Sequence, residues 1–132
     1  MSAAHDLYAY LVTQQGYSGA PVFVGGLPET PDLAVTVIPF GGPPPILAMG
    51  QHNVVERVTY LQVLVRGAPG GYAGAETVAE ALWQLCRHAL GVTVGAVYYD
   101  RIVAVSEPTS VTPTGNGRPL LSFTVEAWKR GS

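Results

Sequence analysis

The strongest constraint on the fold of this chain is an alternation of apolar and polar residues in two long segments. In residues 120–130 the two alternating sets are Leu121, Phe123, Val125 and Ala127 against Ser122, Thr124, Glu126 and Trp128. In residues 54–66, Leu61, Val63 and Val65 are expected to point one way and Tyr60, Gln62 and Arg66 the other. A period of two residues is typical of a strand with one buried face. Both segments are therefore predicted to be long strands of a sheet that is buried on one side and partly wet on the other.

Residues 72–90 have a helical period instead. Their apolar side chains recur every three or four positions, as on the buried face of a helix. This stripe consists of Ala75, Val78, Ala79, Leu82, Leu85, Cys86 and Ala89. Gly91 is the expected end of this helix. A shorter helix is predicted over residues 2–15, with Ser2 as its N-cap and Gly16 as its end.

The order of the predicted elements indicates the fold class. Two further strands are predicted over residues 33–40 and 98–106, so the order is helix, strand, strand, helix, strand, strand. This order predicts an α+β fold, a mainly antiparallel four-stranded sheet with two helices packed on one face. A chain of 132 residues has the length of one domain, so residues 1–132 are expected to form a single domain.

Two segments are predicted to be loops, residues 41–45 and residues 107–119. Residues 16–50 contain 7 of the 16 glycines and 7 of the 11 prolines. Within them, Pro43, Pro44 and Pro45 predict a rigid, extended connector, because proline fixes φ and donates no backbone hydrogen bond. A ligand for an SH3-like domain is the alternative. Residues 107–119, which include Asn116, are too long for a tight hairpin, and such loops are usually functional or mobile.

The charge content favours contact with other proteins. Charged residues make up 12% of the chain, with 7 Lys and Arg against 9 Asp and Glu, whereas about 25% is usual. A surface so poor in charge predicts uncharged patches that contact another protein. The alternative is a compact monomer coated in Ser, Thr, Gln and Gly. The arginines form no run, so tight binding of nucleic acid is not expected.

No pattern of catalytic or cofactor-binding residues is found, and an enzyme is not predicted. The glycines of residues 67–74 lack the spacing of a phosphate-binding loop. Cys86 and His88 would lie about 200° apart on a helix, so they cannot form a catalytic pair or share a metal ion. Cys86 is expected to be a small core residue, and no cofactor or metal site is expected.

The N-terminal residues do not resemble a signal peptide and no segment is long and apolar enough to span a membrane, which indicates an intracellular protein.

The order of several short motifs resembles the tail terminator, or minor capsid, proteins of long-tailed bacteriophages. The motifs are Val65-Arg66-Gly67 after a strand, Gly71-Tyr72 with Ala75, Ala79 and Leu82 on a helix, Glu107-Pro108, Gly115-Asn116-Gly117-Arg118-Pro119, and Ser122-Phe123 with Val125. The resemblance covers about residues 33–130. It implies a subunit of a homohexameric ring in the neck of the virion, made in the bacterial cytoplasm. The implied partners are the tail tube protein and the head-tail connector or a head-completion protein, with DNA only as passing cargo and no membrane.

Candidate interface residues follow from this resemblance and from the residue types. Trp83 and Trp128 are candidate anchors between subunits, with peripheral core as the alternative for Trp83. Arg66, Arg101 and Arg118 are candidates to face the DNA channel, with an inter-subunit ion pair or a plain surface position as the alternatives. The loop residues Pro43, Pro44, Pro45 and Asn116 are candidates for assembly contacts, as is any unpaired edge of the sheet.

Two other functions remain open at this stage. A head-completion or neck adaptor protein would have a similar small build and ring symmetry. A dimeric small-molecule-binding α+β domain is an alternative of a different class, with Tyr98, Tyr99 and Asp100 near a cleft between helix and sheet.

Overall fold

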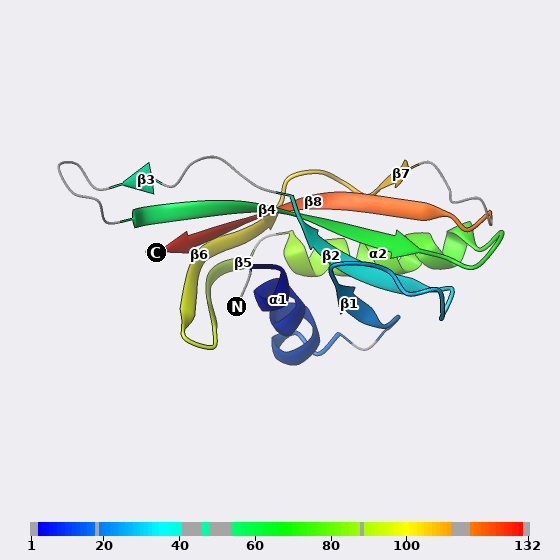
Figure 1. The fold of residues 1–132 in the computed structure, drawn as a ribbon, viewed down its shortest axis with the longest axis horizontal. Helices are drawn as coiled ribbons and strands as arrows, with labels where there is room; N and C mark the ends of the chain where they lie inside the picture. Colours follow the sequence, from blue (N-terminus) through cyan, green and yellow to red (C-terminus); the bar gives the residue numbers. More distant parts are fainter. Residues whose placement is uncertain are drawn as a thin grey trace.

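The computed structural model describes residues 3–17, 19–40, 46–47, 54–87, 89–111 and 117–130. Its elements are the helix α1 (Ala3–Ala9), continued by the π-helix η1 (Tyr10–Gln14), and the strands β1 (Val22–Val24), β2 (Ala34–Pro39), β3 (Ile46–Leu47) and β4 (Val54–Arg66). The helix α2 (Tyr72–Cys86) and the strands β5 (Ala89–Val94), β6 (Val97–Ala104), β7 (Thr109–Val111) and β8 (Leu120–Arg130) follow. Figure 1 shows one curled sheet with both helices on the inside of its curve.

The sheet has eight strands within the described residues, so the predicted α+β fold with a four-stranded, mainly antiparallel sheet is wrong. The main path is β1-β2-β4-β8-β6-β5, with β3 beside β4 and β7 beside β8. The pairing is mixed, because β1 runs parallel to β2 while the other pairs are antiparallel. Strands of two or three residues, as in β1, β3 and β7, contain too few alternations to reveal their period.

The antiparallel pair β4 and β8 forms the centre of the sheet. Its register extends from Glu56 opposite Arg130 to Arg66 opposite Leu120. Both strands have the predicted ends, and the predicted alternation of β8 is confirmed, since Leu121, Phe123, Val125 and Ala127 are buried. β4 and β8 each pair with two shorter strands on the side that faces away from the central pair. β2 and β3 lie one after the other beside β4, and β6 and β7 lie one after the other beside β8.

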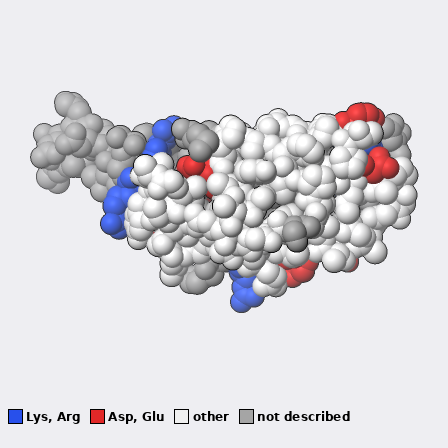
Figure 2. Space-filling view, turned by 90° about the horizontal axis from the view of Figure 1, so that it is seen from below, with Lys and Arg blue, Asp and Glu red and all other residues white. Residues whose placement is uncertain are grey.

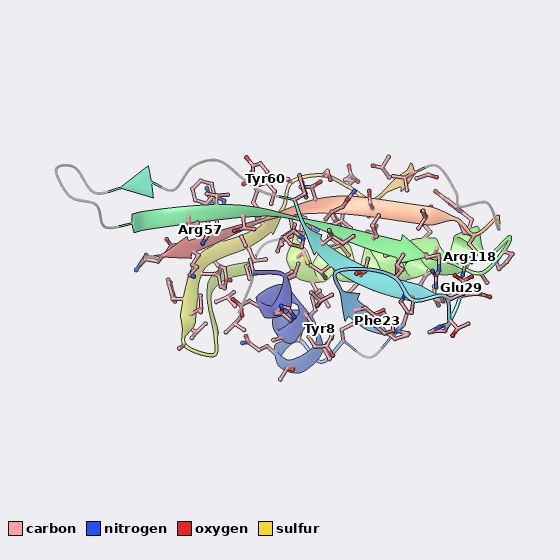
Figure 3. The ribbon with its side chains drawn as sticks, viewed as in Figure 1. Tyr8, Phe23, Glu29, Arg57, Tyr60 and Arg118 are labelled. Atoms are coloured by element: carbon pink, nitrogen blue, oxygen red, sulfur yellow. The ribbon has the colours of Figure 1, made fainter. Side chains whose placement is uncertain are left out.

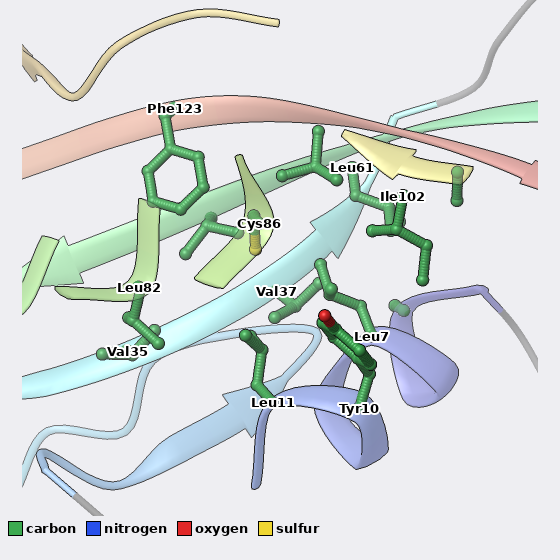
Figure 4. Packing of buried hydrophobic residues seen from close by; sticks show 14 of the residues in the cluster. Leu7, Tyr10, Leu11, Val35, Val37, Leu61, Leu82, Cys86, Ile102 and Phe123 are labelled. Atoms are coloured by element: carbon green, nitrogen blue, oxygen red, sulfur yellow. The ribbon is translucent and has the colours of Figure 1, made fainter. Parts of the chain in front are cut away.

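The core lies between the sheet and the two helices, on the concave face (Figures 1 and 4). Figure 4 shows Leu7 and Leu11 from the N-terminal helix facing Val37 of β2, and Leu82 and Cys86 of α2 near Phe123 of β8. All of these side chains are at most 1% exposed. The predicted N-terminal helix is confirmed as α1 with η1, and Gly16 follows with φ +67°.

The second helix is shorter than predicted. α2 ends at Cys86, and Ala89 begins β5 rather than continuing the helix to residue 90. Ala89 is buried in β5 and would also lie on the buried stripe of a longer helix, so its apolar character does not distinguish the two arrangements. Gly91, the expected helix stop, lies within β5 at φ +64°. Gly95 begins the two-residue turn between β5 and β6 at φ +60°, which suits a type II′ hairpin.

None of the helices in the described part of the chain has both the length and the apolar character needed to cross a membrane.

Candidate assembly surfaces

Two of the candidate arginines are buried at the end of the molecule where β4 ends and β8 begins. Arg66 is 4% exposed, and it donates hydrogen bonds to the backbone oxygens of Pro31 (2.7 Å) and Asp32 (3.0 Å). Arg118 is 5% exposed, and it forms ion pairs with Glu29 (3.3 Å) and Asp32 (3.4 Å), as Figure 3 shows for Glu29. Both guanidinium groups therefore hold the 29–32 segment against the central strands.

Trp83 lies at the side of α2 and packs against the core cluster. Its indole nitrogen donates a hydrogen bond to the backbone oxygen of Ser106 (3.0 Å), and the guanidinium of Arg87 lies 5.7 Å from the ring centroid. The side chain thus connects α2 to the segment that follows β6. This is the position that a peripheral core residue would take.

The convex face of the sheet, which no helix covers (Figure 1), carries a group of exposed and half-buried aromatic, basic and aliphatic side chains. The strand registers place Leu90, Arg101 and Trp128 side by side, and Phe40 next to Tyr60 with 5.8 Å between the ring centroids. Tyr60 points away from the helices in Figure 3. We call this group the outer patch, and its residues are Phe40, Tyr60, Leu90, Tyr98, Arg101, Trp128 and Arg130.

Two arginines of the outer patch lie over aromatic rings. Arg101 is 4.0 Å from the ring centroid of Trp128, and Arg130 is 5.0 Å from that of Tyr98. Trp128 also donates a hydrogen bond to Glu126 (3.1 Å), and Arg130 pairs with Asp100. These contacts restrict the motion of both guanidinium groups but leave them exposed. Leu90 and Phe40 add apolar area, being 61% and 52% exposed.

A groove of about 640 Å³ lies beside α2 and is lined by acidic residues. Glu76 and Glu80 of α2 face it from one side and Glu107 from the segment after β6. We call it the acidic groove, and its lining residues are Tyr72, Glu76, Thr77, Glu80, Ala81, Gln84, Glu107, Pro108 and Leu121.

Charged side chains are unevenly distributed over the surface of the molecule. Most of the face seen in Figure 2 is uncharged, and Lys and Arg gather mainly at the end where β4 begins and β8 ends. There the sheet register places Arg57 opposite Lys129, while Arg101 lies opposite Trp128. Within the described residues, Arg57, Arg101 and Lys129 form no ion pair, and neither do the three carboxylates of the acidic groove.

The residues of the alternative small-molecule cleft do not converge on one site. Tyr99 is buried on the concave face and donates a 2.5 Å hydrogen bond to the carboxylate of Asp6, which is 3% exposed. Burial raises the pKa of Tyr99, and the hydrogen bond to Asp6 raises it further. Tyr98 is instead exposed on the outer patch, where Asp100 pairs with Arg130.

Cys86 is a core residue, as predicted. Burial raises the pKa of its thiol to about 12, which keeps the sulfur in the unreactive protonated form at neutral pH. No group of three or more metal-ligating side chains occurs among the residues that the structure describes. Pro43, Pro44, Pro45 and Asn116 lie outside the described residues.

Sequence reasoning missed the acidic groove, although the α2 side of the groove could be read from the sequence. Glu76 and Glu80, four residues apart, would share one face of a helix, but the sequence does not indicate that Glu107 lies across from them. It also did not reveal that Arg101 lies over Trp128, because the pairing of β6 with β8 and its register, which is irregular between Tyr99 and Arg101, depend on tertiary contacts.

Comparison with known proteins identifies the fold. No known family and no curated protein matches this sequence. Among solved structures, a protein identified only by a sequence number shares 18% identity at a TM-score of 0.61, with 98% of this chain and 96% of that chain covered. A chain from the virion of a native gene transfer agent particle shares 13% identity at a TM-score of 0.59, with 95% of this chain and 84% of that chain covered. The chain therefore has the fold of a subunit found in that particle.

Proposed function

We propose that this chain is a structural virion protein and that it acts as a tail terminator. Its copies form a ring that caps the head-proximal end of a phage tail tube and joins it to the head-tail connector. The observation that carries this proposal is the fold shared with a chain of the gene transfer agent virion over 95% of this chain. The order of motifs that resembles tail terminator proteins supports the same role from the sequence.

The surface of the chain is suited to an assembled state. One face of the sheet is without a covering helix, and it exposes Phe40 and Leu90. Apolar side chains on an exposed sheet face favour association with another protein. A ring also needs two different contact patches on each subunit, and the outer patch and the acidic groove are two such surfaces.

The proposal includes the composition and place of the ring. We expect a homohexamer in the neck of the virion, assembled from chains made in the bacterial cytoplasm. Its partners are the tail tube protein and the head-tail connector or a head-completion protein. DNA passes through the lumen as cargo, the role is structural rather than catalytic, and neither a cofactor nor a membrane takes part.

The oligomeric state tests this proposal directly. Native mass spectrometry and sedimentation velocity are run on the chain alone and together with its tail tube protein, followed by electron microscopy of the mixture. We expect rings of six, and one ring at a single end of each tube. A chain that stays monomeric under both conditions would overturn the proposal. Location of the tagged chain inside the connector, away from the tube, would favour a neck adaptor instead.

A further inference from the structure

Arg101 of the outer patch and the carboxylates of the acidic groove carry opposite charges that have no ionic partner among the described residues. The three ion pairs among the described residues use Arg118 with Glu29 and Asp32, and Arg130 with Asp100. In the outer patch, Arg101 forms no ion pair with a described carboxylate. In the acidic groove, Glu76 and Glu107 form no ion pair with a described basic side chain. Arg101 and the three groove carboxylates Glu76, Glu80 and Glu107 are four of the 16 ionic residues of the chain.

The two surfaces of one copy face in different directions, so they cannot meet each other. α2 packs on the concave side, where Ala79 and Leu82 belong to the same core cluster as Phe123. Arg101 and Trp128 point from the opposite, convex side of the sheet. A contact between the two surfaces must therefore join two copies, and it is head-to-tail, because each copy contributes a different surface.

The geometry of the outer patch suits a carboxylate partner. Arg101 lies 4.0 Å from the centroid of the Trp128 ring, which restricts the guanidinium while its N–H groups remain able to donate. A planar guanidinium pairs best with a carboxylate through two parallel hydrogen bonds. Leu90 is 61% exposed beside Arg101, and Tyr72 is 43% exposed in the groove, so both surfaces combine charge with apolar area.

The size of such a contact is compatible with the area of the chain. A standard interface buries about 800 Å² on each partner. The chain has 6900 Å² of accessible surface, so two patches of that size would occupy about a quarter of it. A ring subunit buries both patches at once, and the remaining surface is enough for contacts with a tube and a connector.

We propose that the outer patch of one copy binds the acidic groove of the next copy, with Arg101 facing Glu76, Glu80 and Glu107. This inference rests on the proposed ring function and specifies the contact that closes the ring. The partner of each surface is a second copy of this chain, recognised by opposite charge around an apolar centre.

Two charge-reversed variants test the contact. One carries Arg101→Glu in the outer patch, and the other carries Glu76→Lys and Glu80→Lys in the acidic groove. Each variant alone places like charges in every contact, and we expect self-association weaker by at least about tenfold. In a mixture of the two variants, each contact between unlike copies joins opposite charges again. The mixture should therefore assemble into rings with strict 1:1 alternation, as measured by native mass spectrometry.

The controls separate charge from folding. Thr13→Lys and Gln15→Glu change the charge at exposed positions outside both surfaces and should leave assembly unchanged. Rescue in the mixture would itself show that both variants are folded, and circular dichroism of each variant checks this independently.

Each possible result bears on the inference. Rings formed by either variant alone at the wild-type concentration would contradict the contact while leaving the ring function in place. Weakened association without rescue in the mixture would also contradict it, because the two surfaces would then not pair with each other. If the wild-type chain forms no ring with or without tail tube protein, the proposed function fails and the inference fails with it.

Discussion

At the scale of single residues, the buried polar groups have structural roles. Arg66 follows the outward alternation of β4, yet it is 4% exposed, because the 29–32 segment covers it and supplies carbonyl oxygens to its donors. The hydrogen bond between Tyr99 and Asp6 joins β6 to the first helix in the same way. In both cases one polar group is buried only because a residue far along the chain satisfies it.

Replacement of Arg66 by Met tests the first of these contacts. Arg66→Met keeps most of the side-chain volume but leaves the backbone oxygens of Pro31 and Asp32 without this donor. We expect the free energy of unfolding to fall by about 2 kcal/mol. Urea denaturation measures the change, and Arg87→Met, at an exposed position, is the matched control. Equal losses in the two variants would show that the buried hydrogen bonds contribute little.

The Tyr99–Asp6 hydrogen bond predicts a loss of stability at alkaline pH. Burial and the contact with Asp6 hold the pKa of Tyr99 above its ordinary value of 10.0 in the folded chain. The unfolded chain therefore loses this proton first, so stability is complete below about pH 10 and decreases as pH rises toward the folded pKa. Burial also raises the pKa values of Tyr10 and Tyr17, which adds to the decrease.

Tyr99→Phe separates the contribution of this residue. The variant should be less stable at pH 7 by about 1–3 kcal/mol, because the buried carboxylate of Asp6 loses its donor. Its free energy of unfolding should also decrease less steeply than that of the wild type between pH 9 and about pH 11. Urea titrations across this range provide the measurement, with the exposed Tyr72→Phe as control. Parallel pH profiles for the wild type and Tyr99→Phe would contradict the assignment.

At the scale of elements, small residues determine how closely α2 lies to the sheet. Ala75 and Ala79 are fully buried in the core cluster, while Gln84 and Glu80 are exposed on the other side of the helix. A helix that meets a sheet through alanine can approach it closely, and the larger Leu82 and Phe123 fill the space beside this contact. The position of α2 in turn fixes one side of the acidic groove.

A larger residue at the contact should therefore destabilise the fold. Ala79→Leu forces extra volume between α2 and the sheet, and we expect a loss of about 1–3 kcal/mol in the free energy of unfolding. Thermal unfolding followed by circular dichroism measures it. Ala73→Leu, on the exposed side of the same helix, is the control and should change the stability little. A stability equal to that of the control would show that α2 shifts without cost.

At the scale of the whole molecule, the sheet is organised around the single long pair of β4 and β8. These strands have neighbours on both sides, whereas β1, β3, β5 and β7 are each paired with one strand. The arrangement leaves strand edges and one sheet face for contacts with other chains. The molecule thus has a centre that is paired on both sides, and its open strand edges and the outer patch lie around it.

Amide hydrogen exchange should reproduce this organisation. The central residues of β4 and β8 are expected to exchange only through global unfolding, since their hydrogen bonds lie over the core. Amides of β1 and β7 should exchange earlier, through local opening. Exchange is measured by mass spectrometry at concentrations below those that promote association. Protection in β1 or β7 equal to that in β8 would contradict a centre of stability in the β4 and β8 pair.

Several features of the fold and surfaces could be predicted from the sequence alone. The ends of β4 and β8, the buried positions along β8, the N-terminal helix and the core position of Cys86 all follow from periodicity, which is a property of neighbouring residues. The scarcity of charge is also readable in the sequence, because composition does not depend on the fold.

Only the tertiary structure decided the rest. Ala89 and Leu90 became part of β5 because β6 supplies backbone partners for them, although their residue types also fit a helix. β1, β3 and β7 exist as strands because a longer strand lies beside each of them. The burial of Arg66 and Arg118 and the meeting of Glu107 with α2 likewise depend on segments distant in sequence. A local pattern encodes which face of an element is buried, whereas the partner of each face is set by long-range packing.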